Sequence, residues 1–240
     1  TSASSPPRPQ ARCLSNEGYP EMQKTMQELV RNKLTSVQRI EVASDQFGNQ
    51  DVVSSVLQRD ANAIRMTSDA LDRGQMARAV EAILAARHIY IVGVRSSAAL
   101  ANYLNFYFRN IFDNVRLVSS TATSEMFEQL LRVGKEDVVI GISLPRYSSR
   151  TVKLLQYAHD SGATVVTITD KPEAPGGKVA DLVLCAKSNM VSFVDSLVAP
   201  MSVINALIVS VGLQQEDSVA KTYEDLERLW DEYDAFERVE

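Results

Sequence analysis

Five short runs of apolar, mostly β-branched residues, most of them followed by a stretch with helical spacing, leave this chain few possible folds. The runs are mostly continuous apolar stretches, with few polar residues inside them. That pattern is typical of parallel strands whose two faces are both covered by helices. The sequence therefore predicts an α/β fold with a doubly wound, five-stranded parallel sheet. The five runs are His88–Gly93, Val115–Ser119, Asp137–Ser143, Ala163–Thr169 and Asp181–Ala186.

Helical segments are expected before this sheet. Residues 1–16 are rich in proline and serine and are interpreted as irregular, while helical spacing begins at Pro20. The polar stretch Asp45–Asp51 is interpreted as a linker. A longer helix follows and ends near Gly74, and another covers Met76–Arg87. The apolar side chains expected on one face of the longer helix are Val53, Leu57, Ala61, Ile64 and Leu71.

Two helices are expected after the sheet. The first covers residues 195–213; it is uniformly apolar but short for a membrane span, so a buried helix is the preferred interpretation. The second covers Lys221–Glu240 and has an aromatic stripe opposite an acidic face. That stripe could dock on its own domain or cross a dimer interface, and the pattern does not choose between them.

Composition excludes several classes of protein. Hydrophobic residues make up 45% and charged residues 23%, which is ordinary for a globular chain and excludes disorder throughout. Two cysteines and two histidines cannot supply a disulfide scaffold and argue against a structural zinc site. We therefore expect a cytoplasmic protein with no metal, no cofactor and no membrane partner. Residues 1–16 also contain no apolar run of signal-peptide length.

The loop after the first predicted strand is a candidate anion site. In an open parallel sheet, ligands bind at the carboxyl ends of the strands. This loop reads Gly93-Val94-Arg95-Ser96-Ser97 and lacks the further glycines of a dinucleotide-binding turn. Its serines lie where a helix begins, and free N–H groups at a helix start can bind phosphate. The alternative is that the serines only cap the helix.

The loop after the third strand strengthens the case for an anion. It contains hydroxyl side chains at Ser143, Ser148, Ser149 and Thr151, together with Arg146, Tyr147 and Arg150. Such a loop can surround an anion with hydroxyls, helix N–H groups and a guanidinium. A capped helix with solvated arginines is the alternative. Two such loops on neighbouring α/β units favour a phosphorylated small ligand.

The two loops together resemble those of a SIS (sugar isomerase) domain, in the form found in RpiR-type (MurR/RpiR family) transcriptional regulators. Ser148, Ser149 and Thr151 match the last positions of the family's Ser-x-Ser-Gly-x-Thr motif, whereas Ser143 lies two residues further upstream than that motif expects. The resemblance implies a sheet of flavodoxin-like strand order that binds a phosphosugar. It also implies that the phosphate is held by Ser97, Ser143, Ser148 and Thr151. Candidate contacts to the rest of the ligand are Arg95, Ser96, Arg146, Tyr147, Ser149 and Glu125.

The resemblance also implies a helix-turn-helix domain ahead of the SIS domain, but the sequence does not show an intact one. Residues from Gly18 to Leu34 resemble its last part, whereas Ser-Ser-Pro-Pro-Arg-Pro occupies the place of the recognition helix. Either the sequence is truncated or altered upstream, or this copy no longer binds DNA. We therefore expect DNA as a partner only if the native protein has a complete helix-turn-helix.

These observations give an expected domain organisation. Residues 1–45 are an incomplete remnant of a DNA-binding domain and residues 46–87 are a linker with leading helices. Residues 88–215 are the phosphosugar-binding SIS domain, and residues 216–240 are an acidic C-terminal helix. A homodimer or tetramer is expected.

Three functions remain open. The favoured one is a regulator that responds to a sugar phosphate and has no enzymatic activity. The main alternative is a sugar-phosphate aldose–ketose isomerase, which needs an acid or base near the carbonyl. His88 and His159 are poorly placed for that role, and Glu125 is explained equally well as a helix-start residue. The third function is that of a binding or scaffold protein without a DNA-binding domain.

Overall fold

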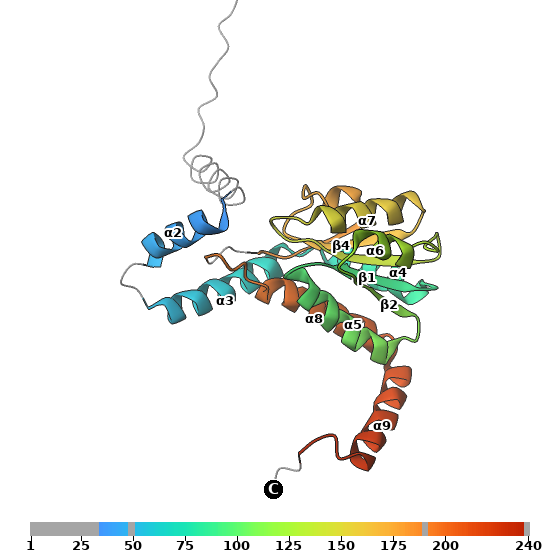
Figure 1. Ribbon diagram of the computed structural model, residues 1–240. Helices are drawn as coiled ribbons and strands as arrows, with labels where there is room; N and C mark the ends of the chain where they lie inside the picture. Colours follow the sequence, from blue (N-terminus) through green and yellow to red (C-terminus); the bar gives the residue numbers. More distant parts are fainter. Residues whose placement is uncertain (1–33, 48–50, 189–191, 238–240) are drawn as a thin grey trace, which may run out of the picture.

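A five-stranded parallel sheet forms the centre of the molecule in the computed structural model, which describes residues 34–47, 51–188 and 192–237 (Figure 1). The strand order is β2-β1-β3-β4-β5, and every neighbouring pair is parallel. The predicted sheet and its flavodoxin-like order are confirmed. Because β2 and β3 flank β1 on opposite sides, the switch point lies at β1 and β3. The strands are β1 Ile89–Gly93, β2 Val115–Val118, β3 Val138–Ile142, β4 Thr164–Thr169 and β5 Leu182–Cys185.

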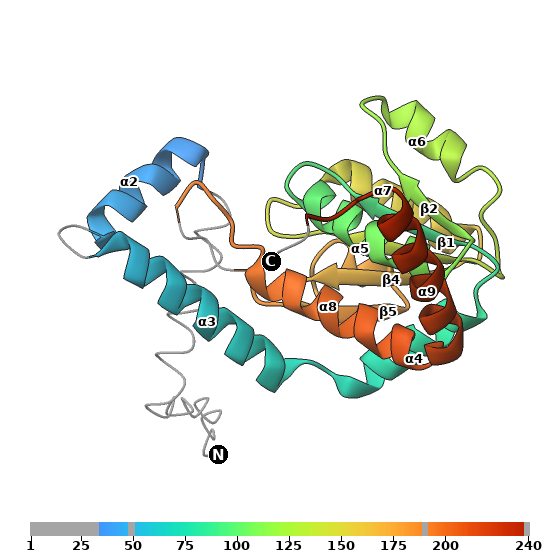
Figure 2. The same cartoon turned by 90° about the horizontal axis from the view of Figure 1, so that it is seen from below.

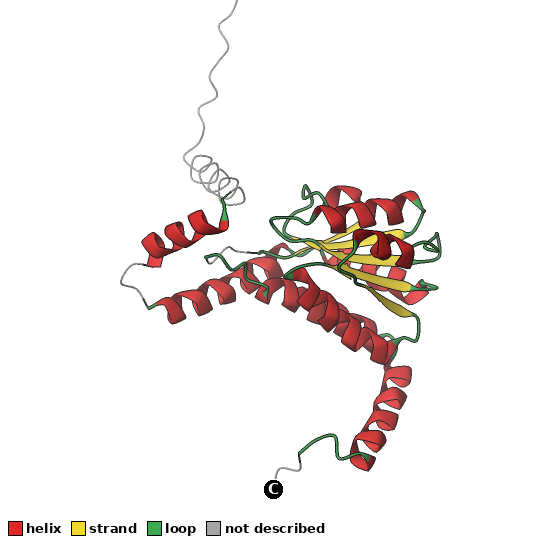
Figure 3. Cartoon of the chain, viewed as in Figure 1, coloured by secondary structure: helices red, strands yellow, loops and turns green. Residues whose placement is uncertain are grey.

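Helices cover both faces of the sheet (Figure 3). The alternating side chains of each strand divide the core into two clusters: Ile89 and Ile91 pack on one face, Tyr90 and Val92 on the other. Helices α4, α5 and α8 contribute to the first cluster, α6 and α7 to the second. This two-sided burial explains why the strands are continuously apolar. The helices are α4 Arg73–Ala85, α5 Ser97–Ile111, α6 Thr123–Gln129, α7 Ser149–Asp160 and α8 Val198–Leu213, and a short 3-10 turn covers Gly177–Val179.

Two helices precede the sheet domain, α2 (Ser36–Phe47) and α3 (Val52–Ala70). The linker between α2 and α3 is shorter than the predicted Asp45–Asp51, because α2 continues to Phe47. Asp51 caps α3 by accepting a hydrogen bond from the Val53 amide at 3.0 Å. Helix α3 packs against α8 (Figure 2), and its buried residues are Ala63 and Thr67. Of the apolar residues expected on one face, Leu71 is buried, whereas Val53 and Leu57 are 67% and 63% exposed.

The break between α3 and α4 falls slightly earlier than predicted. Leu71 and Asp72 separate the helices, and Gly74 lies in the first turn of α4. The Asp72 carboxylate accepts hydrogen bonds from the amides of Gly74 and Gln75, at 2.8 and 3.0 Å. A side-chain cap, and not the glycine, therefore sets where α4 begins.

Helix α9 (Glu216–Glu232) begins where the expected acidic helix 216–240 begins, five residues before the helical spacing from Lys221. It ends at Glu232, earlier than predicted, and contacts α5 and α8. Its Tyr223 hydroxyl accepts a hydrogen bond from Asn110 at 3.4 Å. Further along, Tyr233 is 74% exposed, so the aromatic stripe docks only at its beginning. A role at a dimer interface stays a prediction. No single helix in the described residues is long and apolar enough to cross a membrane, and α8 and α9 meet that criterion only as a pair bent by 100°.

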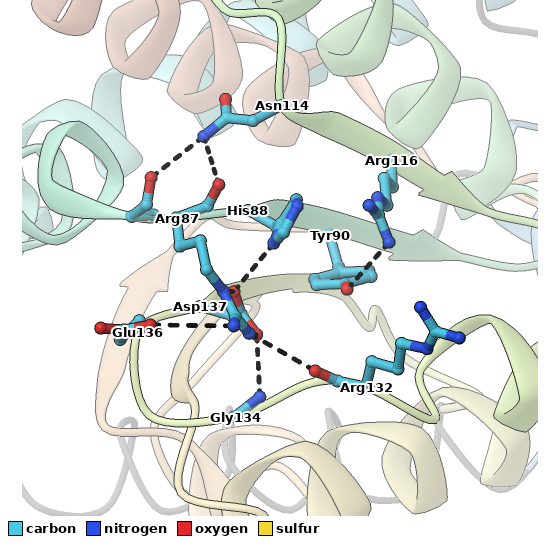
Figure 4. A network of polar contacts seen from close by, with 10 residues as sticks. Arg87, His88, Tyr90, Asn114, Arg116, Arg132, Gly134, Glu136 and Asp137 are labelled. Carbon is cyan, nitrogen blue, oxygen red and sulfur yellow. Dashed lines mark hydrogen bonds and ion pairs between the residues drawn. The ribbon is translucent and has the colours of Figure 1, made fainter.

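At the amino ends of the strands, the fully buried carboxylate of Asp137 organises a polar network (Figure 4). It accepts hydrogen bonds from Arg87 Nε and Nη2 at 2.9 and 2.6 Å and from the Gly134 amide at 2.8 Å, and His88 Nδ1 lies 3.3 Å away. Burial opposes the charge of Asp137, but these hydrogen bonds outweigh it, so the pKa of Asp137 lies below its ordinary value. His88 thus contacts Asp137 at the end of the sheet opposite the candidate ligand loops, as expected.

Candidate ligand-binding site

A cavity of about 400 Å³ opens at the carboxyl ends of the strands, beside the switch point. It is lined by residues 94–97 after β1, by the loop after β3, and by a third segment just before α8. Seven of the ten predicted ligand residues meet here, from two loops far apart in the sequence. They are Arg95, Ser96, Ser97, Ser143, Arg146, Ser148 and Thr151.

Three of the hydroxyls that line this cavity are buried, those of Ser97, Ser143 and Thr151. The Oγ of Ser143 and the Oγ1 of Thr151 have no hydrogen-bond partner among the described residues. A buried polar group without a partner costs free energy, which a bound hydrogen-bonding ligand would offset. Ser97 begins α5, and Thr151 lies in the first turn of α7. Free amide groups at both helix starts favour an anion at the same place.

The two loops share an unusual backbone feature, since each contains an arginine in the left-handed region. The φ angles are 57° at Arg95 and 65° at Arg146. Residues other than glycine adopt this conformation infrequently, and when they do, they cluster at functional sites. Both arginines line the cavity, so the two residues with a strained backbone are also residues that carry a positive charge at the candidate anion site. Arg146 also donates a hydrogen bond from Nη1 to the Ser36 hydroxyl of α2 at 3.0 Å.

A second, wider cavity of about 900 Å³ shares Val94, Arg95, Arg146 and Ser148 with the first. Tyr147 and Ser149 line only this second cavity. The Tyr147 hydroxyl donates a hydrogen bond to Asp170 Oδ1 at 2.8 Å, and its burial beside that carboxylate raises the pKa of Tyr147. Tyr147 is therefore bonded within the protein, whereas Ser143 and Thr151 are not.

Glu125 is the predicted ligand residue that the structure does not bring together with the others. It lines neither cavity, and its carboxylate accepts a hydrogen bond from Ser120 at the start of α6. His159 also lies apart from the loops. It is half-exposed near the carboxyl end of α7, with Nε2 3.8 Å from Asp181 Oδ1.

The sequence interpretation missed the third wall of the cavity, formed by Phe193, Val194, Asp195 and Leu197. These residues follow β5 and precede α8, in a region that the sequence pattern placed partly in a helix from residue 195. The rule that ligands bind after parallel strands applies to the segment after β5 as well, and would have indicated them. Asp195 brings a carboxylate into the site, and its Oδ1 lies 2.7 Å from Arg39 Nη1 of α2.

Gly93 sets how closely α5 approaches β1. A Cβ at this position would lie 2.7 Å from the Ser97 carbonyl oxygen and 2.9 Å from the Ala101 Cβ. We expect Gly93→Ala to lower the free energy of unfolding by about 2 kcal/mol, because the start of α5 must move away from the strand. Urea unfolding measures this effect. Gly134→Ala is the matched control and should change stability little, since a Cβ there meets nothing within 4 Å.

These features define a class of protein first: a doubly wound α/β domain with a hydroxyl-lined cavity at its switch point. Residues 82–210 match the family model of the SIS domain, and the chain belongs to the SIS domain family. The prediction of a SIS domain of the kind found in RpiR-type regulators is confirmed.

The similar proteins include regulators and enzymes. An uncharacterized HTH-type transcriptional regulator of Caldanaerobacter subterraneus subsp. tengcongensis is 28% identical over 73% of this chain and 64% of its own length. The chain thus spans less than two thirds of that relative. Among solved structures, the sugar isomerase domain of an RpiR transcription factor from Sphaerobacter thermophilus has a TM-score of 0.71 and 25% identity, covering 75% of this chain and 99% of its own.

Two further solved structures share the fold. The NanR protein of Vibrio vulnificus, complexed with ManNAc-6P, has a TM-score of 0.65 and 21% identity, covering 79% of this chain and 73% of its own. Phosphoheptose isomerase GmhA of Neisseria gonorrhoeae has a TM-score of 0.57 and 15% identity, covering 66% of this chain and 96% of its own. The fold is therefore common to regulators and isomerases, and the choice between them depends on the site.

Proposed function

We propose that this chain is the phosphosugar-sensing and dimerisation part of a transcriptional regulator. The observation that carries the proposal is the pair of buried hydroxyls, Ser143 Oγ and Thr151 Oγ1, unpaired among the described residues in a cavity between two helix starts. The names of the regulators to which the chain is similar support this function, as does the ManNAc-6P bound by NanR.

In the proposed mechanism, the phosphate binds at the starts of α5 and α7. Ser97, Ser143, Ser148 and Thr151 offer hydroxyl donors there, and the first-turn amides and helix dipoles favour its negative charge. Arg95 or Arg146 adds a guanidinium. Binding then shifts the geometry between subunits, provided that the ligand has a higher affinity for one arrangement than for the other.

The remaining parts of the proposal concern the whole protein. The SIS domain covers residues 88–215, a helical connection precedes it, and the acidic helix follows it. The helix-turn-helix remnant assigned to residues 1–45 falls mostly outside the described residues, so its DNA contact stays a prediction. A cytoplasmic location and a homodimer or tetramer are predictions of the same kind.

A thermal-shift panel tests the proposed function directly. We expect one sugar phosphate from a set that includes ManNAc-6P, glucose 6-phosphate and arabinose 5-phosphate to stabilise the chain. At a hundredfold its Kd, a ligand that binds only the folded state adds about 2.7 kcal/mol. The matching free sugars and inorganic phosphate are the controls. Equal shifts with a sugar phosphate and its free sugar, or no shift with any compound, would contradict the proposal.

An isomerase is the second candidate, favoured by the fold shared with phosphoheptose isomerase. An isomerase needs an acid or base beside the sugar carbonyl. Glu125 lines neither cavity, and both histidines lie away from them. The sugar phosphate found in the panel can be incubated with the chain and followed by NMR. Aldose–ketose conversion would favour the isomerase, and an unchanged sugar would favour the sensor.

A further inference from the structure

Helix α2, which precedes the SIS domain, contacts two residues of the candidate cavity. Ser36 accepts a hydrogen bond from Arg146, and Arg39 pairs with Asp195. The segment that contains Asp195, drawn in orange before α8, lies beside α2 in both Figure 1 and Figure 2. A helix outside the sheet domain thus positions part of the wall of the site.

Arg39 and Asp195 form an ion pair in which the guanidinium is buried and the carboxylate is partly exposed. Arg39 is 0% exposed, and its Nη1 lies 2.7 Å from Asp195 Oδ1. The Nε and Nη2 of Arg39 have no hydrogen-bond partner among the described residues. A buried guanidinium requires compensation by an opposite charge, and Asp195 supplies it. The pair therefore holds the Asp195 carboxylate in a fixed position at the cavity wall through its Oδ1.

The charge of Asp195 limits what can lie beside it. A phosphate dianion would be repelled by this carboxylate, and the same cavity offers hydroxyls and two helix starts for the phosphate. The part of the ligand beside Asp195 must therefore be uncharged or positive, and it must bring a hydrogen-bond donor. Sugar hydroxyls and the N–H of an acylated amino sugar both meet this requirement.

We propose that Asp195, positioned by Arg39 of α2, accepts a hydrogen bond from the sugar end of the ligand and selects sugar monophosphates over phosphorylated sugar acids and bisphosphates. This inference rests on the proposed function and names the ligand class within it. Arg39 is a positioning residue, since it does not line the cavity.

Isothermal titration with the aldose phosphate from the panel, starting with ManNAc-6P, tests the proposal. A second titration uses the C1 acid made from the same sugar phosphate. We expect the wild type to prefer the aldose phosphate at least about tenfold. In Asp195→Asn, affinity for the aldose phosphate should fall about tenfold or more, because a charge-assisted hydrogen bond is lost. The preference over the acid should fall as well, which a purely structural role of Asp195 would not cause.

Two further variants keep the test decisive. Asp195→Asn leaves Arg39 buried without its partner, so Arg39→Met/Asp195→Asn removes both charges and retains packing. This double variant should have the same free energy of unfolding as the wild type. It should also lose the preference for the aldose phosphate over the acid, as Asp195→Asn does. Asp60→Asn is the matched control, since Asp60 Oδ1 accepts a hydrogen bond from Ser196 at 2.6 Å but does not line the cavity.

The outcomes separate this inference from the proposed function. If sugar phosphates bind, and a folded Asp195 variant keeps both the wild-type affinity and the wild-type preference, the role of Asp195 is wrong while the sensor stands. If no sugar phosphate binds the wild type, the proposed function fails, and this inference fails with it.

Discussion

Replacing Ser143 by Ala and Thr151 by Val together is expected to weaken sugar-phosphate binding about a hundredfold, because each hydroxyl donates to a charged group in the complex. The same double variant should be as stable as the wild type or more stable. Both hydroxyls are buried without a hydrogen-bond partner among the described residues, so their removal relieves a desolvation cost. Titration calorimetry gives the affinity, and urea unfolding without ligand gives the stability.

A matched control separates binding from folding. Thr167→Val makes the same chemical change in β4, where the Thr167 hydroxyl donates to the Gly176 carbonyl at 3.3 Å. This variant should lose stability and keep its affinity, the reverse of the cavity variant. If the Ser143/Thr151 variant binds the sugar phosphate as the wild type does, the two hydroxyls are not part of the site.

Asp137→Asn is expected to lower the free energy of unfolding at pH 7 by about 4 kcal/mol, since it removes one partner from a buried charged network. The carboxylate accepts hydrogen bonds from Arg87 and the Gly134 amide, and an amide side chain cannot replace all of them. Sugar-phosphate affinity should change little, because Asp137 lies at the opposite end of the strands. Urea unfolding measures the loss. The exposed pair of Asp225 and Arg228 provides the control, with an effect of Asp225→Asn below about 1 kcal/mol.

Asp137 also predicts a pH dependence. Its pKa is lowered in the folded state, so its stabilising effect is fully present above the ordinary pKa of an aspartate, about 3.9. That stabilisation is lost as the pH falls below this value and through the lowered pKa. The wild type should therefore lose more stability than Asp137→Asn between about pH 5 and pH 2. Parallel pH profiles would refute the role of this carboxylate.

The sheet could be predicted from the sequence because its central strands β1, β3 and β4 are buried on both faces. Continuous apolar runs such as Val138–Ile142 follow directly from that burial, and the carboxyl ends of parallel strands define where the loops meet. The two hydroxyl-rich loops could be found for the same reason. To predict that these loops meet at one cavity, one further fact was needed, namely that β1 and β3 are neighbours in the sheet.

The rest depends on contacts between distant residues, which a local pattern does not contain. Arg39 and Asp195 are 156 positions apart, and neither stands out in its own segment. The apolar spacing of α3 was visible, but it did not show which face would be covered. The small side chains of Ala63 and Thr67 let α3 approach its neighbours, and the larger Val53 and Leu57 stay exposed.

The contact between α3 and α8 has a consequence for the synthesis of the protein. Helix α3 leaves the ribosome long before the helix that it packs against, which begins only at Val198. Until that helix emerges, the nascent chain carries α3 without its main partner, and one face of the sheet lacks part of its cover. The last steps of folding of this domain therefore wait until α8 has emerged, and a stall before residue 198 would yield an aggregation-prone chain.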